Sequence, residues 1–468
     1  MLIRKGRQLW EWLDDRVGFT ETFGPMATHL VPRGARWWYV FGSATLFAFL
    51  IQVFSGVALA FSYIPSSSQA YDTLLFITHQ AKFGAFMRAL HYYGASAMVL
   101  MVGLHMAQVY LFGAYKYPRE MTWVTGVLML GFTLIMGFTG QLLRWDQTGV
   151  WSVIVAAEQV GRVPLIGDWL ARFTLGGDMV GGATLSRFFA IHVFVMPALV
   201  FAFVGIHILG VLRHGISAPP KLGELARRQT YRRDYQELLK KDGVPFWPDS
   251  AWRDVVFGAA MAGTIVLLAI FFGPPELGEP PDPSIIEAYP RPDWYLLWYF
   301  AVLALLPQGT EEYFMVFGPL LAGLLLIGLP FFSRSGERHV RRRPWAVAIV
   351  LCVVLMIGTF WMAGAKSNWS PNFHIQPLSE KVVRSQDQQV RRGAQLFYSK
   401  GCLNCHLIDG YGGRRGPDLS AVGAQRTPEH ITIMTLNGKG NMPAYANNLT
   451  PEEMAALLAF LKTRTGEP

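Results

Sequence analysis

The sequence predicts an all-α membrane protein in which seven transmembrane helices precede a small all-α C-terminal domain. Hydrophobic residues make up 52% of the 468 residues and charged residues only 16%, which departs from the composition of an ordinary soluble domain. The excess lies in seven apolar blocks, each long enough or nearly long enough to cross a hydrocarbon core of roughly 30 Å as a helix. These predicted spans are 38–62, 89–112, 123–143, 188–212, 252–272, 314–332 and 345–363.

The number of lysines and arginines is high in every second segment between the spans, and this difference predicts the orientation of the chain in the membrane. Four segments carry 21 of these residues and the three alternate loops carry at most seven, so we expect the N-terminus in the cytoplasm and the C-terminus outside. No apolar stretch follows the basic N-terminus, so we expect no cleavable signal peptide. The formal charge of +9 does not indicate nucleic acid, because the basic runs RRQTYRR and ERHVRRR lie between spans. The four basic segments are 1–37, 113–122, 213–251 and 333–344.

Two spans each contain a pair of histidines. His91 and His105 are 14 residues apart, and His192 and His207 are 15 apart. At ~100° per residue each pair lies within about 60° of one helix face, separated by a rise of roughly 21–23 Å. We expect the two helices to lie antiparallel and to pair His91 with His192 on the outer side and His105 with His207 on the inner side. Bis-imidazole ligation of two stacked haems needs this geometry, although a single such histidine is also compatible with packing or a polar pathway.

Two other spans repeat the same interval with glycine. Gly42 and Gly56 are 14 residues apart, as are Gly126 and Gly140. A missing side chain at both levels would let a porphyrin lie against the backbone. Glycine also serves ordinary helix packing in membranes, so the matching interval is what favours the haem interpretation.

With these motifs, nearly all of residues 20–365 resembles cytochrome b of the cytochrome bc family. The similarity is closest to the plastid type, in which a four-helix cytochrome b is followed by a three-helix subunit IV. Here the two are joined, as 1–215 and 216–365. The resembling stretches are YPREMTWVTGV, RWDQTGVW, PLIG, TLSRFFAIH and HGIS in the first part, and GEPPDPS and PDWY in the second.

The resemblance implies two non-covalent b haems and two quinone sites. Arg88 and Arg187 would neutralise haem propionates, although arginines at span ends can also snorkel. In the PDWY segment, Asp293 would act as the general base that takes a proton from quinol, with Tyr295 beside it. The inner quinone site is weakly indicated. Its candidates are Arg213 and His214, for which a solvated helix end is an equal alternative.

Three positions depart from the family pattern. Asp293 stands where the family often has Glu, which shortens its reach by one carbon. Arg144 stands where proline usually precedes Trp145, and so adds a charge near the expected outer pocket. Val40 stands where plastid-type relatives have a haem-binding cysteine, so we predict no third membrane haem.

A polar linker, 366–390, leads to a segment, 391–468, that resembles a small class I cytochrome c. Cys402 and Cys405, in the motif Cys-x-x-Cys-His, would attach one haem c covalently, and His406 would be an axial ligand. Zinc is disfavoured because no second cysteine pair is present. Met442 is the predicted second axial ligand. The alternatives are Met434, Met454, which is better placed for packing, and His430, while Cys352 is expected to pack within a span.

The predicted function is that of a haem-carrying core subunit of a quinol:cytochrome c oxidoreductase in a bacterial-type inner membrane. The resemblance implies a separate Rieske iron–sulfur protein, a further cytochrome c, membrane lipid and quinone, and a homodimer within a larger complex. Three alternatives remain: a non-bifurcating di-haem anchor for another oxidoreductase, a structural scaffold with degenerate haem sites, and a transporter that uses its histidines as a proton relay.

Overall fold

The computed structural model describes residues 2–177, 180–281, 291–307, 310–366, 376–412, 416–438, 442, 445–446 and 448–466. Seven of its helices are long and apolar enough to cross a membrane, which confirms the predicted fold class. They are α3 (Phe41–Ala60), α5 (Gly84–Leu111), α6 (Glu120–Leu142), the continuous α9–η2–α10 (Gly182–His214), α12 (Ala251–Phe271), α14 (Glu311–Phe332) and α15 (Pro344–Lys366).

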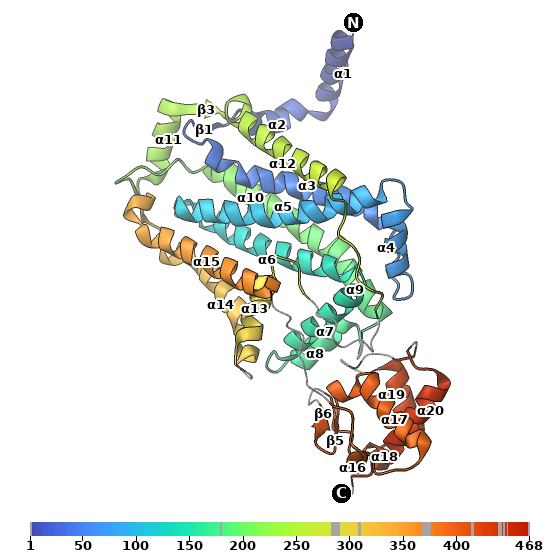
Figure 1. Ribbon diagram of the computed structural model, residues 1–468. Coiled ribbons are helices and arrows are strands. Elements are labelled where there is room, and N and C mark those ends of the chain that lie inside the picture. Colours follow the sequence, from blue (N-terminus) through green and yellow to red (C-terminus); the bar gives the residue numbers. More distant parts are fainter. Residues whose placement is uncertain are drawn as a thin grey trace.

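The long helices form one bundle with a different set of short elements at each end (Figure 1). Helix α3 packs on α5 and α10 packs on α6, while α12 covers α3 and α5. One end, here called the basic end, carries α1 (Leu2–Val17), α2 (Phe19–Thr28) and α11 (Tyr231–Asp242). The opposite end, here called the cavity end, carries α4 (Ala70–His79), α7 (Gln147–Gly161), α8 (Gly167–Leu175) and α13 (Leu297–Leu305).

The bundle exposes large apolar side chains around its outside. Leu324 and Leu355 are 57% and 67% exposed, as expected where lipid rather than water surrounds a helix. The interior is built from small residues such as Ala44, Ala48 and Ser55, all fully buried. The close spacing this permits brings α3 and α5 together.

A π-helical turn, η2 (Ile191–Val195), interrupts the fourth span at His192. Pro197 follows it and lacks the N–H that a regular α-turn would use. A π-turn accommodates one extra residue. The 15-residue interval between His192 and His207 therefore matches the 14-residue interval on α5, and π-turns of this kind often occur at functional sites.

Buried cations cap helix C-termini at the basic end. Arg343, only 2% exposed, donates to the Tyr110 and Leu111 carbonyls at the end of α5, with both nitrogen–oxygen distances at 3.3 Å. Arg119 donates to the His214 carbonyl at the end of α10 (3.0 Å). Lys116 donates to the Ser333 carbonyl just beyond α14 (2.8 Å). Each cation meets the negative end of a helix dipole.

Two short antiparallel sheets also tie the basic end together. β1 (Leu30–Pro32) pairs with β3 (Gly243–Pro245), with Val31 opposite Val244. β2 (Leu225–Ala226) pairs with β4 (Gly336–Glu337). The short helices η1 (Trp37–Tyr39), η3 (Phe246–Ser250) and η4 (Val340–Arg342) complete these connections.

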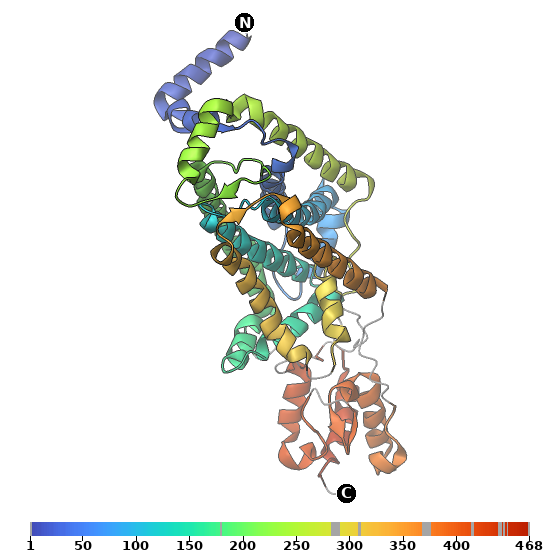
Figure 2. The same cartoon turned by 90° about the vertical axis from the view of Figure 1, so that its left-hand side faces the viewer.

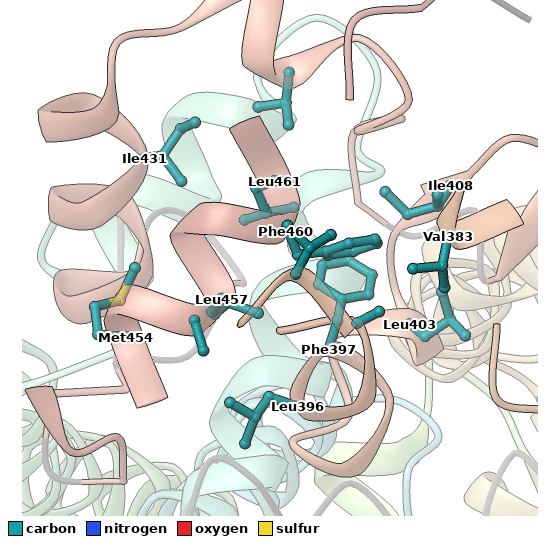
Figure 3. Close-up of a cluster of buried hydrophobic side chains, with 14 of the residues drawn as sticks. Val383, Leu396, Phe397, Leu403, Ile408, Ile431, Met454, Leu457, Phe460 and Leu461 are labelled. Atoms are coloured by element: carbon teal, nitrogen blue, oxygen red, sulfur yellow. The ribbon is translucent and has the colours of Figure 1, made fainter. Parts of the chain in front are cut away.

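The C-terminal domain lies beyond the cavity end, and Figure 2 shows it opposite the N-terminal helix. Its core forms where α17 (Gln388–Ser399) crosses α20 (Pro451–Lys462), with the Phe397 and Phe460 rings 5.7 Å apart (Figure 3). Gly393 allows this crossing, because a Cβ there would lie 2.0 Å from the Ala456 carbonyl oxygen. The remaining elements are α16 (Glu380–Val383), η5 (Cys402–Asn404), α18 (Val422–Gln425), α19 (Pro428–Asn437) and the hairpin of β5 (Leu407–Ile408) and β6 (Tyr411–Gly412).

The core of this domain begins within the segment predicted as a linker. Val382 and Val383 are buried in it, and buried Arg464 donates to both of their carbonyls (2.7 and 2.9 Å). Met454 is also buried there (Figure 3), in agreement with its expected packing role.

Candidate functional site

The four histidines of the spans form two facing pairs. His91 and His192 have ring centroids 6.2 Å apart, with ring planes at 76°. His105 and His207 have centroids 6.4 Å apart at 71°. The first pair lies toward the cavity end and the second toward the basic end. Both histidine-bearing spans, α5 and α9–η2–α10, run from the cavity end to the basic end, so they are parallel and the antiparallel packing expected from the sequence is wrong. Antiparallel helices would have placed His91 opposite His207.

Both separations fit a metal ion between two imidazoles. Metal–imidazole bonds are about 2.0–2.1 Å, and a ring centre lies about 1.1 Å from its nitrogen, so two coordinated rings have centres about 6.3 Å apart. Two neutral nitrogen donors on opposite sides are the axial set of a six-coordinate haem iron. The residues present therefore fit a haem at each level.

The four predicted glycines make room for these imidazoles. A Cβ added at Gly140 would lie 2.7 Å from His192 Cε1, and one at Gly42 would lie 3.1 Å from His105 Cε1. The corresponding distances are 3.2 Å at Gly56, against His91, and 3.5 Å at Gly126, against His207. Each glycine thus faces one histidine. The glycines repeat every 14 residues because two histidines, one at each level, need this space.

Hydroxyl groups beside three of these glycines contact the histidines. Ser55 Oγ lies 2.9 Å from His91 Nδ1. Thr139 Oγ1 lies 3.1 Å from His192 Nδ1, and Thr125 Oγ1 lies 3.0 Å from His207 Nδ1. The Nδ1 of His105 is buried and has no hydrogen-bond partner within the described residues.

A cavity of about 270 Å³ opens at the cavity end. The His91–His192 pair and the PDWY segment both contribute to its wall, and the helix faces between them are mainly apolar. A concave, largely apolar space with a few convergent polar groups is typical of a small-molecule site. The polar or charged side chains in its lining include Gln52, Arg88, His91, Gln141, Arg144, His192, Asp293 and Tyr295.

Asp293 and Tyr295 lie against each other in this cavity. The Tyr295 hydroxyl donates to Asp293 Oδ2 at 3.1 Å. Burial raises the pKa of the Asp293 carboxyl above its usual range, while the Arg144 charge and the Tyr295 hydroxyl oppose that shift. A buried carboxyl whose pKa is raised toward neutrality is suited to exchanging protons.

Buried Gln141 holds the PDWY backbone against α6. Its Oε1 accepts from the Asp293 N–H at 3.0 Å, and its Nε2 donates to the Arg291 carbonyl at 2.9 Å. Gly137, one turn earlier on α6, leaves space for the Tyr295 ring, since a Cβ there would lie 2.3 Å from the Tyr295 hydroxyl. The acid is therefore positioned by the four-helix part of the chain.

Arg144 places a positive charge near Asp293. Its Nε lies 3.6 Å from Asp146 Oδ2, and the Asp146 side chain is 1% exposed. Asp146 also accepts from the Gly149 and Gly278 amides (2.8 and 3.1 Å). Because those two bonds satisfy Asp146 without Arg144, the guanidinium is available to the cavity.

The two arginines predicted to neutralise haem propionates have different surroundings. Arg88 is buried, lines the cavity and donates to Thr78 Oγ1 and to the Pro275 carbonyl (3.0 and 2.6 Å). Arg187 is exposed, donates to the Phe173 carbonyl and is not among the lining residues. Val40 is buried where α3 begins.

At the basic end, the predicted pair Arg213 and His214 ends α10. Arg213 is exposed and His214 is half-buried. The His214 carbonyl is taken up by Arg119, which also donates to the Tyr231 hydroxyl. Neither Arg213 nor His214 is among the residues that line the cavity at the opposite end.

In the C-terminal domain, His406 is oriented for coordination. Its Nδ1 donates to the Pro417 carbonyl at 2.8 Å, and a carbonyl can only accept, so Nε2 keeps its lone pair. Cys402 is the first residue of η5, and Cys405 follows η5 directly before His406. Gly416 approaches the imidazole closely, since a Cβ there would lie 2.6 Å from His406 Cε1. Met442 is half-buried.

Several functional contacts were not predicted from the sequence. Ser55, Thr125 and Thr139 each directly precede a predicted glycine, and this repeated Ser/Thr-Gly pair is the signal that could have identified them. The unequal histidine intervals, together with Pro197, indicate the π-turn. Nothing local distinguishes Gln141, because its role depends on a partner 152 residues away.

Together, the paired imidazoles, their glycine recesses and the Cys-x-x-Cys-His domain define a multi-haem membrane electron-transfer protein. Family models agree: "Cytochrome b/b6/petB" matches residues 26–215, "Cytochrome b(C-terminal)/b6/petD" matches 282–380, and "Cytochrome C oxidase, cbb3-type, subunit III" matches 388–461. The chain belongs to the cytochrome b/b6 family, with a subunit IV-like part and a c-type cytochrome domain fused in one polypeptide.

Individual relatives support the same assignment. Cytochrome b6 of Synechococcus sp. (strain JA-3-3Ab) is 40% identical over 212 residues, which are 45% of this chain and 99% of that protein. Cytochrome b6 of Prochlorococcus marinus (strain NATL1A) is 38% identical over 211 residues, 45% of this chain and 97% of that protein. A solved structure titled "Hyperthermophilic respiratory Complex III" matches with a TM-score of 0.65 and 29% identity, covering 76% of this chain and 91% of that one. The chain is thus a bc-type cytochrome b core subunit and a multi-pass membrane protein.

Proposed function

We propose that this chain is the haem-carrying core subunit of a quinol:cytochrome c oxidoreductase that oxidises quinol at the cavity end. One observation carries the proposal: the His91–His192 pair, Asp293 and Tyr295 line a single cavity. A quinol bound there would touch a proton acceptor and lie beside an electron acceptor at the same time. When bound, the two b haems supply one-electron carriers at two depths of the bundle, held by His91/His192 and His105/His207, and the haem c supplies a third.

Oxidation of one quinol to quinone releases two protons and two electrons. The Asp293 carboxylate accepts one proton from a quinol hydroxyl, with the Tyr295 hydroxyl orienting it. Both protons then leave to the outside. One electron would pass to a Rieske iron–sulfur protein and the other would enter the bundle. Two such turnovers would supply the two electrons that, with two protons taken up from the cytoplasm, reduce one quinone to quinol near Arg213 and His214. Arg88 balances negative charge beside the cavity-end pair.

The proposed topology follows from the loop charges. The basic end faces the cytoplasm and the C-terminal domain lies outside, where Cys402 and Cys405 hold haem c and His406 and Met442 serve as its axial ligands. Tethering this domain makes transfer from the Rieske partner to the c haem effectively intramolecular. The bc-type likeness further supports a homodimer and a second cytochrome c as partners.

A redox-titrated optical spectrum of the purified complex, with a pyridine haemochrome count, tests the proposal. We expect two b haems per c haem, and reduction of the b haems by quinol when an inner-site inhibitor is present. One b haem or none would overturn the two-level ligation. Full haem content without quinol-driven b reduction at the cavity end would instead favour a non-bifurcating anchor.

A further inference from the structure

The Ser/Thr-Gly pairs give three of the four span histidines a defined ring orientation. In each pair the glycine makes room for the imidazole, and the preceding hydroxyl lies within 2.9–3.1 Å of its Nδ1. The three glycines are Gly56, Gly126 and Gly140. The fourth, Gly42, follows Phe41 instead. His105, which faces Gly42, is the histidine whose Nδ1 lacks a partner within the described part of the chain.

The hydroxyl protons are already used, and this sets the direction of the bonds to the rings. Ser55 Oγ donates to the Ile51 carbonyl at 2.6 Å. Thr125 Oγ1 donates to Thr122 (2.9 Å), and Thr139 Oγ1 donates to Met136 (3.0 Å). A hydroxyl has one proton and two lone pairs, so each of these oxygens accepts from the ring. Nδ1 therefore carries the proton, and Nε2 presents a lone pair.

We propose that Ser55, Thr125 and Thr139 are positioning residues that fix the tautomer and orientation of three haem-ligating histidines, and that His105 ligates without such a partner. This inference rests on the haem ligation proposed above. An N–H···O bond at Nδ1 makes the imidazole a more basic ligand. A more basic ligand stabilises oxidised iron, so loss of the hydroxyl raises the midpoint potential of the haem at that level.

Potentiometric titration of the b haems in the purified complex tests this through Thr139→Val, which replaces the hydroxyl by a methyl group of similar size. At a fixed potential we expect the ferrous-to-ferric ratio of the cavity-end haem to rise by up to about tenfold, or 59 mV for one electron. Thr139→Ser should restore the wild-type potential. The matched control is Thr45→Val, because Thr45 Oγ1 also donates to a carbonyl one turn back, that of Phe41 (2.8 Å), but contacts no histidine in the described structure.

A second variant covers failure of the first. If Thr139→Val loses its b haem while Thr139→Ser and Thr45→Val retain theirs, the positioning role is supported, and Ser55→Ala should then shift the potential of the same haem. Unchanged potentials in Thr139→Val and Ser55→Ala with full b haem content would overturn the inference. Absence of b haem from the unmutated complex would instead overturn the proposed ligation.

The missing fourth hydroxyl can be installed. Phe41→Ser places a hydroxyl directly before Gly42, at the position that Ser55 occupies before Gly56. We expect the basic-end haem to become harder to reduce, with its ferrous-to-ferric ratio at fixed potential falling several-fold. An unchanged potential of the basic-end haem, with intact haem content, would overturn the inference that a hydroxyl at Nδ1 tunes the ligand His105.

Discussion

The two ends of the bundle use their arginines in different ways. At the basic end, buried Arg343 and Arg119 donate to carbonyls where α5 and α10 end. At the cavity end, buried Arg88 and half-buried Arg144 line an open space, and Arg144 lies beside the buried Asp146 carboxylate. Arg88 also donates to the Pro275 carbonyl, but both cavity-end arginines face a volume large enough for a ligand, which the basic-end pair does not line. The atoms that surround a buried cation, and not its burial, separate a structural from a functional role.

This difference predicts two separable kinds of variant. Changes at the basic end should lower stability without changing the chemistry of the folded protein, because their partners are helix termini. Changes at Asp293 and Arg144 should alter quinol oxidation with little effect on stability, because both side chains line the cavity. A variant that moves both properties together would weaken the comparison.

The largest effect is expected at Asp293. Replacement by Asn keeps the shape and removes the proton acceptor, so quinol oxidation should fall by about 10²–10⁴-fold, the usual contribution of a general base. The measurement is the steady-state rate of quinol:cytochrome c reduction per b haem.

Asp293→Glu is the matched control, since it keeps the carboxylate and adds one carbon of reach. It should retain most of the rate. An Asn variant as fast as the wild type would show that Asp293 does not accept the quinol proton.

At the basic end, Arg343→Met should lower the free energy of unfolding by about 2–3 kcal/mol, because it removes a buried charged donor from the Tyr110 and Leu111 carbonyls. Thermal loss of the helical signal in detergent measures this. The neighbouring Arg342→Met is the control: its side chain is 59% exposed and 3.7 Å from Glu337, and such surface pairs contribute about 0–1 kcal/mol.

The comparison would fail if both variants were equally stable. It would also fail if Arg343→Met slowed quinol oxidation in the fraction that remains folded, because a helix cap at this end has no contact with the cavity.

A smaller effect is expected from Gly137→Ala on α6. The new Cβ would lie 2.3 Å from the Tyr295 hydroxyl, so the ring must move away from Asp293. Misplacement of a positioned group costs rate, and we expect roughly a tenfold loss with unchanged b haem content. Gly131→Ala on the same helix meets nothing within 4 Å and should behave as wild type. Equal rates for the two variants would show that Tyr295 does not orient the acid.

Much of this arrangement could be predicted from periodic features of the sequence. Residues such as His91 and His105 repeat at a helical interval, and the apolar blocks are long, so each feature can be recognised within one segment. Partnerships between distant segments could not be predicted. Gln141 contacts residues 150 and 152 positions away, and no local pattern marks it.

The apolar blocks predicted the number of spans correctly, but counting lysines and arginines did not predict the roles of the individual charges. The run ERHVRRR was interpreted only as a topology signal, yet Arg338 and Arg343 in it are buried at 8% and 2% exposure while Arg342 is exposed. These neighbouring arginines differ in their partners. Arg343 donates to carbonyls at the end of α5 and Arg338 donates to the Ala218 carbonyl, whereas Arg342 lies 3.7 Å from Glu337. That information exists only after the helices have packed.

The smallest expected effect is a change in pH dependence at Arg144. Burial raises the pKa of Asp293 and the Arg144 charge lowers it, while Asp146 raises it further. If quinol oxidation requires the Asp293 carboxylate, the rate increases with pH through the pKa of that group. Arg144→Gln removes the opposing cation, so the pKa rises and the rate limb moves to higher pH, by about one unit.

Arg144→Lys keeps the charge and should leave the limb near its wild-type position, which separates electrostatics from shape. The Gln variant should still fold, because Asp146 retains its bonds to the Gly149 and Gly278 amides. The test is the rate of quinol oxidation per b haem, measured as a function of pH from about 5 to about 9. A limb that stays in place in Arg144→Gln, or that moves equally in Arg144→Lys, would mean that this arginine does not tune the acid. The cavity-end cation would then resemble those at the basic end.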